Sequence, residues 1–228
     1  MTKQPIFSEA LGVDFKNPAL LVTALTHRSY LNENRTIKEH NERLEFLGDA
    51  VLELVSTEFL FHKMPDMPEG TLTSIRAALV RKDNLDKAAR KLDVGSHLLL
   101  SRGEDAGGGR TNPYLLANAV EAIIGAIYLD QGIAPAKKFI ELHVLTTLDE
   151  ILAGHLYQDG KSRLQEIAQD KHKITPTYQV LDSVGPDHEK TFTVGVYFTG
   201  EQQGQGSGKS KQSAELKAAE DALEKLGW

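Results

Sequence analysis

Apolar residues recur every three or four positions through most of the first 150 residues, a spacing typical of amphipathic helices. The pattern predicts helices over residues 18–30, 40–62, 71–80, 83–92, 113–130 and 134–152. Strand-like alternation of apolar and polar residues is missing from this part of the chain. We therefore expect the first part of the protein to be all helical.

The pattern changes after a short, polar, glycine-containing segment, GHLYQDGK (154–161). Helical spacing returns over 162–171, but residues 176–183 and 190–198 alternate between apolar and polar, as strands do. Glycine-rich residues lead out of the second strand, and an alanine-rich amphipathic helix is expected over 209–226. We predict two domains, 1–153 and about 156–228, joined by a linker at 154–161. The second has the order α-β-β-(β)-α.

The composition is that of an ordinary globular protein, with 40% hydrophobic and 25% charged residues among 228. No apolar stretch is long enough for a transmembrane helix, and the N-terminus lacks the features of a secretory signal. The chain has no cysteine, which excludes disulfides and thiolate metal sites. We expect a cytoplasmic protein without membrane contact. The net charge is −6, and neither predicted domain is net basic, so any polyanion must bind to a local basic patch.

Three acidic residues of the predicted helix 40–62 fall on one narrow arc: Glu42, Glu45 and Asp49. The opposite side carries the apolar stripe of Leu44, Leu47, Val51 and Leu54, which is predicted to be buried. Like charges at this spacing repel, so a cation is expected nearby. Carboxylate oxygens suit Mg²⁺. A solvated acidic face is the alternative interpretation.

Helix 113–130 carries Asn118 and Glu121 on one side of an otherwise strongly apolar segment. Polar side chains in such a helix must be solvated or satisfied by a partner, and a metal ion shared with the first helix would satisfy both. Glu69 is a further candidate, although an acid near a helix N-terminus also complements the helix dipole. Phe46 falls beside the carboxylates and either fills local core or contacts a partner subunit.

The segment NERLEFLGDAVL (41–52) resembles the signature of bacterial ribonuclease III, an endonuclease of double-stranded RNA. Further similar segments, one of them upstream of residue 41, occur in the family's order along nearly the whole chain. They are LTHRSY, PEGTLTSIRAALV and LLANAVEAIIGAIYLD, and then SRLQE, PTY, GPDHEKTF and GSGKSKQSAELKAA of that family's RNA-binding domain. The resemblance implies an all-α endonuclease domain followed by a small α+β double-stranded-RNA-binding domain.

The resemblance also implies roles for the acidic residues. Asp49 and Glu121 match the catalytic carboxylates, and the metal set comprises Glu45, Asn118 and Glu121. Asn118 stands where the family pattern has an aspartate. An amide oxygen can still bind Mg²⁺, so we expect weaker metal affinity with retained activity.

The family's homodimer forms beside the signature helices, and Phe46 matches the aromatic residue that enters the partner subunit. Glu42 and Glu69 match two more acids of a shared catalytic valley, whose two sites each cut one RNA strand and leave short 3′ overhangs. The implied cofactor is Mg²⁺, with Mn²⁺ as a plausible substitute. The implied substrates are precursors of ribosomal RNA and some messenger RNAs.

In the RNA-binding domain, the resemblance places six residues at contacts with duplex RNA: Gln165, Glu166, His188, Lys209, Lys211 and Gln212. Gln212 stands where the family often has lysine. Arg102 and Arg110, in an expected mobile loop over 101–112, are further candidates for phosphate contact. His27 is interpreted as a structural hydrogen-bonding residue.

Three alternatives belong to other functional classes. A protein that binds duplex RNA without cutting it is favoured only by Asn118 and opposed by the three carboxylates Glu45, Asp49 and Glu121. A purely structural dimer with a solvated acidic face leaves the RNA-binding segments unexplained. A helical di-iron protein is excluded, because no glutamate is followed by histidine three residues later.

Overall fold

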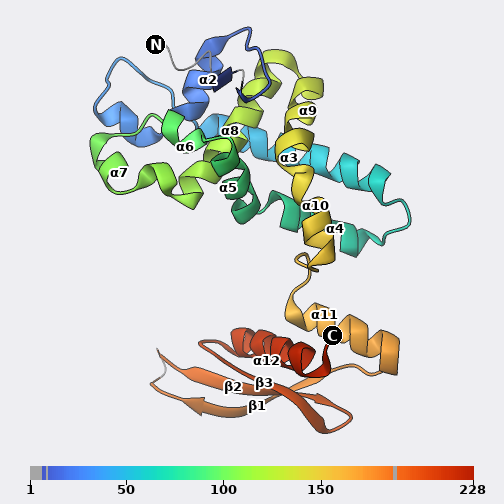
Figure 1. Ribbon diagram of the computed structural model, residues 1–228. Helices are drawn as coiled ribbons and strands as arrows, with labels where there is room; N and C mark the ends of the chain where they lie inside the picture. The colour runs from blue at the N-terminus through green and yellow to red at the C-terminus, as the bar shows by residue number, and fades with distance from the viewer. Residues whose placement is uncertain (1–6, 9, 187–188) are drawn as a thin grey trace. The chain divides into compact units, whose positions relative to one another are not determined.

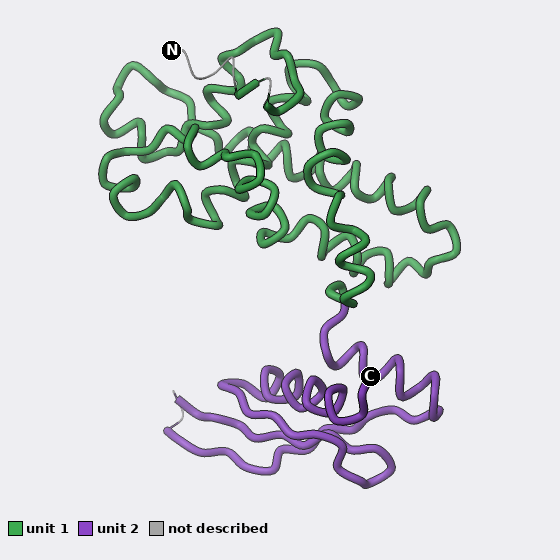
Figure 2. Tube along the Cα trace, in the orientation of Figure 1, with its two compact units in different colours: residues 1–157 green, residues 158–228 purple. Residues whose placement is uncertain are grey.

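The structure is a computed structural model that describes residues 7–8, 10–186 and 189–228. The chain divides into two compact units, residues 1–157 and 158–228 (Figure 2). His188, predicted to contact RNA, lies outside the described residues. The predicted fold class is confirmed: over the described residues, the first unit is helical, and the second combines two helices with a three-stranded sheet.

The described part of unit 1 consists of helices joined by turns and loops (Figure 1). The longer helices are α2 (Pro18–Leu25), α3 (Glu42–Lys63), α4 (Glu69–Val80), α5 (Lys82–Lys91), α8 (Pro113–Gln131) and α9 (Ile133–His143). The shorter elements are η1 (Arg28–Asn32), α6 (Val94–His97), α7 (Arg102–Ala106), η2 (Gly109–Thr111), η3 (Leu145–Thr147) and α10 (Leu148–Ala153).

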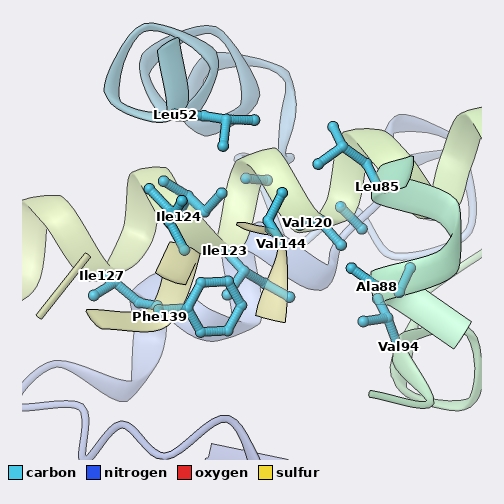
Figure 3. Packing of buried hydrophobic residues seen from close by; sticks show 14 of the residues in the cluster. Leu52, Leu85, Ala88, Val94, Val120, Ile123, Ile124, Ile127, Phe139 and Val144 are labelled. Carbon is cyan, nitrogen blue, oxygen red and sulfur yellow. The ribbon is translucent and has the colours of Figure 1, made fainter. Parts of the chain in front are cut away.

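Helix α8 lies at the centre of unit 1 and packs against α2, α3, α5 and α9. Its start is well defined: Pro113 is the first helical residue, and the Asn112 side chain accepts a hydrogen bond from the Tyr114 backbone N–H. Every residue from Ala122 to Ile127 is buried. Figure 3 shows Ile123 and Ile124 among side chains from neighbouring elements, with Leu52 of α3 directed toward Ile124. This core holds α3 and α8 together and so positions the polar residues that they carry.

Three predicted features of unit 1 differ from the structure. The helix expected over 18–30 ends at Leu25, because Thr26 is extended and forms a β-bridge with Leu99. The helix expected over 134–152 is divided into α9, η3 and α10. The segment 101–112, expected to be a mobile loop, contains α7 and η2 and is held by specific hydrogen bonds.

Unit 2 has the order α11 (Gly160–His172), β1 (Thr177–Val184), β2 (Thr191–Phe198), β3 (Glu201–Gly208) and α12 (Lys211–Leu226). The strands form an antiparallel sheet in sequential order. As the alternation predicts, Val194, Val196 and Phe198 of β2 are buried. Helix α11 begins at Gly160, so the last two residues of the predicted linker are helical.

Alternate glycines let β3 lie directly against α12. A Cβ atom on Gly204 would lie 2.5 Å from the Ala218 backbone oxygen, and one on Gly206 would lie 2.3 Å from the Ala218 nitrogen. Alanines face these glycines from the helix, and Ala214, Ala218 and Ala222 are fully buried. The small residues on both elements therefore explain the close packing that fixes the start of α12 on the sheet.

In the described residues, no helix has the length and apolar character needed to cross a membrane.

Candidate functional site

Helices α3 and α8 cross with their backbones in contact at two glycines. A Cβ atom on Gly48 would lie 1.8 Å from the Glu121 backbone oxygen, and one on Gly125 would lie 2.2 Å from the Leu44 oxygen. Neither position accepts a side chain unless the helices move apart. Because Asp49 follows Gly48 directly and Glu121 lies one turn before Gly125, this crossing places the acidic edges of the two helices next to each other.

The charges of the opposite helix change the pKa of Glu121. Burial, followed by the charges of Asp49 and Glu45, raises the pKa of Glu121 from its ordinary value of 4.5 to about 7. Two of the three causes favour the protonated form because like charges are close, and the other because water is partly excluded. The site therefore lacks positive charge, which a cation among these side chains would supply.

Asn118 is linked to Glu45 across the crossing. Burial and the nearby Glu42 charge raise the pKa of Glu45, while a hydrogen bond with the Asn118 side chain opposes the rise. In this bond the amide N–H donates to the carboxylate, since an ionised carboxylate can only accept. The amide carbonyl oxygen stays available as a ligand. Glu45, Asn118 and Glu121 are half-buried, and Asp49 is exposed.

This set of side chains fits a hard divalent cation. Within the described ranges, no three His, Cys, Asp or Glu side chains form a group able to hold a metal ion. The group at the crossing combines two half-buried carboxylates with an amide, all of them oxygen donors of the type that Mg²⁺ prefers. The raised pKa of Glu121 supports the fit, because this carboxylate needs a positive partner in order to ionise fully at neutral pH.

Glu42 lies at the outer edge of this cluster. It is the first residue of α3, and its Oε1 atom is 3.4 Å from Nη1 of Arg28, while its Oε2 atom is 3.9 Å from Nδ1 of His40. Both contacts are long, and the Arg28 side chain is largely exposed. Glu42 thus adds negative charge beside Glu45 while being partly neutralised from the solvent side.

Glu69 is not part of the cluster within one chain. It is the first residue of α4, is exposed, and accepts a hydrogen bond from Oγ1 of Thr73 at 3.2 Å. Helix α4 follows the C-terminal end of α3, whereas Glu45 lies near its N-terminal end, about 27 Å away along the axis. Both ends of α3 are visible in Figure 1. A contribution from Glu69 to the site therefore requires a second copy of the chain.

One face of α3 exposes large apolar side chains. Phe46 is 81% exposed, Leu54 62% and Phe61 66%. Phe46 was expected beside the carboxylates. The prediction that Leu54 is buried is wrong. Leu54 lies at the edge of the apolar stripe and turns toward the solvent with Phe46 and Phe61, at positions i, i+8 and i+15. The sequence analysis did not single out Phe61.

Arg110 is held within its own segment. Its Nε and Nη2 atoms donate to the two carboxylate oxygens of Asp105 at 2.8 and 3.0 Å, and Nη1 donates to the backbone oxygens of Gly95 and Leu98. These bonds use four of the five N–H donors of Arg110, and contact of this residue with phosphate stays a prediction. Arg102 differs, because its side chain is 97% exposed. Its Nε atom lies 4.0 Å from a Glu33 oxygen, which is a long contact.

His27 is structural, as predicted. It caps η1, where its Nδ1 atom accepts from the Ser29 backbone N–H at 3.3 Å and lies 2.8 Å from the Ser29 hydroxyl. Burial is the main cause that lowers its pKa.

The residues expected to bind RNA in unit 2 are on its surface. Gln165 and Glu166 are exposed on α11, and Lys209, Lys211 and Gln212 are exposed at the start of α12. This helix begins with a capping box between Ser210 and Ser213. A helix N-terminus and two lysines together form a favourable position for phosphate.

An ion pair that the sequence analysis missed joins the two helices of unit 2. Lys161 of α11 donates to Glu215 of α12 at 2.6 Å, and its Nζ atom lies 4.6 Å from the ring centre of Tyr178 on β1. Burial, followed by the charge of Glu215, raises the pKa of Tyr178 to about 12. Lys161 therefore fixes the spacing between the exposed face of α11 and the start of α12.

Both units match known protein families. Residues 17–148 match the family model described as Ribonuclease-III-like, and residues 161–226 match the double-stranded RNA binding motif. Ribonuclease 3 of Desulforamulus reducens is 49% identical over 217 residues, which cover 95% of this chain and 88% of the relative. Ribonuclease 3 of Enterococcus faecalis is 47% identical, with 96% and 95% covered.

A solved structure shows the same fold for unit 1. The nuclease domain of ribonuclease III from Campylobacter jejuni aligns with a TM-score of 0.59 at 41% identity, covering 64% of this chain and 97% of that domain. A second structure of that domain has a TM-score of 0.57 at 43% identity, covers 61% of this chain and 94% of its own, and is described as flexible in a region involved in dimer formation.

Proposed function

The chain belongs to the ribonuclease III family, and we propose that it cuts double-stranded RNA with Mg²⁺ bound by Glu45, Asn118 and Glu121. Asp49 and Glu121 are its proposed catalytic carboxylates. The broader activity, an endoribonuclease that binds duplex RNA, follows from the family and from the RNA-binding motif of unit 2. Metal dependence is a property of the family, and Mg²⁺ as the ion is part of our proposal, with Mn²⁺ as a substitute.

One observation carries the proposal: the contact of α3 and α8 at Gly48 and Gly125 holds Asp49 and Glu45 near enough to raise the pKa of Glu121 to about 7. Without a cation, Glu121 is only partly ionised near neutral pH, since its ionisation adds a negative charge beside Asp49 and Glu45. When bound, Mg²⁺ would activate water and offset charge on the phosphate that is cut. Asp49, at the exposed edge of the cluster, is available to hold a proton close to the reacting phosphate.

We propose that two copies pair through the apolar face of α3 formed by Phe46, Leu54 and Phe61. A row of exposed apolar side chains of this size favours an interaction surface over contact with water. If the two α3 helices run antiparallel, Glu69 of the partner subunit comes near the Glu45 end of this chain. With two clusters, each strand of a duplex is cut once, and offset cuts leave short 3′ overhangs.

Unit 2 is proposed to bind the duplex through Gln165, Glu166 and the start of α12, with His188 as a further contact. A domain of this kind reads the shape of A-form RNA across two minor grooves. Lys209, Lys211 and the α12 N-terminus would contact phosphates, with Gln212 beside them.

We propose domain limits of 1–153 and about 156–228, with the 154–161 segment between them. The cellular substrates are proposed to be precursors of ribosomal RNA and some messenger RNAs, by the resemblance to the family. Because these substrates are transcripts, we place the enzyme in the cytoplasm.

The test is cleavage of an end-labelled RNA duplex by the full chain, with Mg²⁺ or with EDTA, beside the Glu121→Ala variant. We expect cutting that requires Mg²⁺, leaves short 3′ overhangs and is lost in the variant. Size-exclusion chromatography with light scattering should give a dimer for the full chain and a monomer for Phe46→Asp.

Binding without cutting across a wide Mg²⁺ range would overturn the proposed function. That outcome would favour a protein that only binds duplex RNA, and Asn118→Asp would then be the first variant to examine for restored cutting.

A further inference from the structure

One strip of α8 stays open to solvent and leads away from the proposed active site. Its partly or fully exposed members Tyr114, Asn118 and Glu121 are spaced i, i+4 and i+7 along the helix, and thus share one face. Tyr114, at the outer end, is 63% exposed. It lies about 6 Å along the axis from Asn118 and about 10 Å from Glu121.

A lysine from a second helix covers this tyrosine. Lys82 is the first residue of α5, which packs against α8, and its Nζ atom lies 3.3 Å from the ring centre of Tyr114. This is the geometry of a cation–π contact. Among the described residues, Lys82 forms no ion pair with a carboxylate. Its ammonium group is therefore a positioned positive charge that no acid neutralises.

The acidic residues at the α3–α8 crossing suggest a role for the positive charge of Lys82. Glu42, Glu45 and Asp49 give the crossing of α3 and α8 a negative charge, and the exposed Arg28 beside them contacts Glu42 at 3.4 Å. An RNA strand that reaches the cluster must bring its phosphates past this negative charge. A cation fixed on the ring of Tyr114, at the end of the helix face that carries Glu121, can attract a neighbouring phosphate without occupying the metal site.

We propose that Lys82 and Tyr114 form a positioning pair that binds a backbone phosphate of the RNA close to the bond that is cut. The ring holds the lysine in place, and the tyrosine hydroxyl is available to donate a hydrogen bond to the same phosphate or to a 2′-hydroxyl. This inference deepens the proposed function and rests on it, because it assumes that the strand enters the cluster along α8.

The test measures equilibrium binding of the full chain to a short RNA duplex at several salt concentrations. It is made with Mg²⁺ in the Asp49→Asn background, so that binding is read without relying on cutting. We expect Lys82→Met to weaken binding several-fold and to reduce the slope of log K against log[salt] by about one for each phosphate that the lysine no longer neutralises. Tyr114→Leu should weaken binding in the same direction, and Lys82→Arg should keep most of the wild-type affinity.

Lys87→Met is the matched control. Lys87 lies on the same helix and carries the same charge, but it is exposed and paired with Glu150 at 3.0 Å. Equal affinity and equal salt slope for the Lys82 and Lys87 variants would overturn the proposal, and a lower melting temperature of Lys82→Met without a change in slope would reduce the pair to a structural contact. Cleavage by the chain with wild-type Asp49, measured separately, shows whether the proposed function itself fails.

Discussion

At the α3–α8 crossing, Glu45, Asn118 and Glu121 are half-buried, and burial together with neighbouring charges raises the pKa values of Glu45 and Glu121, whereas the side chains proposed to bind RNA on unit 2 are exposed. The first group is held by backbone contact between two helices at Gly48 and Gly125. The second depends on an ion pair between Lys161 and Glu215 and on a helix cap. Chemistry at one phosphate needs fixed geometry, while recognition of a duplex shape tolerates many separate weak contacts.

This difference predicts how the two regions respond to mutation. A single change at the crossing should have a large effect on stability or on metal binding. A single change on the surface of unit 2 should have a small and graded effect on affinity, with no effect on the chemical step.

The largest effect is expected for Gly48→Ala. The added Cβ would lie 1.8 Å from the Glu121 backbone oxygen, so the helices must separate and the core above α8 must repack. We expect unit 1 to lose about 3 kcal/mol of stability or more, together with its cutting activity. Thermal unfolding followed by circular dichroism measures the loss. Gly70→Ala is the control, because no atom lies within 4 Å of the new Cβ; equal melting temperatures for the two variants would show that the contact is not tight.

Next is Glu121→Gln, which tests the cost of placing carboxylates together. The folded state raises the pKa of Glu121 from 4.5 to about 7, so it binds this proton more tightly than the unfolded state does. Protonated Glu121 therefore contributes to the stability of the folded state. This contribution is complete below pH 4.5 and is lost as the pH rises through 7. The full shift corresponds to about 3 kcal/mol, which solvent screening of a partly exposed group reduces to about 1–2 kcal/mol.

In EDTA, Glu121→Gln should therefore be more stable than the wild type at pH 8 and equally stable at pH 4. Exposed Glu39 supplies the control, since Glu39→Gln should change stability little at either pH. A stability gain from Glu121→Gln that does not depend on pH would contradict the electrostatic explanation.

A smaller effect is expected for Asn118→Asp, and its sign should depend on the metal. Without Mg²⁺, the new carboxylate adds like charge and removes the N–H that bonds to Glu45, so unit 1 should be less stable by about 1 kcal/mol. With Mg²⁺, the same charge should lower the half-saturating concentration for cutting by up to about tenfold, or about 1.4 kcal/mol. A Mg²⁺ titration of cleavage rate measures this, and identical half-saturation for the two proteins would refute it.

Residue spacing alone predicted much of this architecture. Three acids on one arc of α3 and two polar residues on the apolar helix α8 indicated which faces meet, and the alternation in β2 identified its buried side. The periodicity predicted a helix that continues past Thr26. The helix ends before this residue, because the β-bridge of Thr26 with Leu99 overrides the local helix preference.

Contacts between distant residues could not be read in this way. Arg110 donates to the backbone oxygens of Gly95 and Leu98, which lie 15 and 12 residues earlier in the sequence, and no periodic pattern predicts these contacts. Gly48 and Gly125 did leave a signal, since glycine inside a helix often marks a close approach, but the partner of each became clear only in three dimensions. Leu54 appeared to belong to the core because spacing distinguishes faces of a helix without showing what covers them.

The smallest effect is expected for Lys211→Met on the surface of unit 2. Lys211 is exposed at the first turn of α12, and its Nζ atom lies 6.0 Å from the ring centre of Phe192, too far for a strong contact. Its loss should weaken duplex binding a few-fold and lower the salt slope by about one, while the cutting rate at saturating duplex stays the same. Lys217→Met, on another face of the same helix, should leave both values unchanged. A slower rate at saturation for Lys211→Met would mean that unit 2 also positions the bond to be cut, and the division between fixed chemistry and graded recognition would then fail.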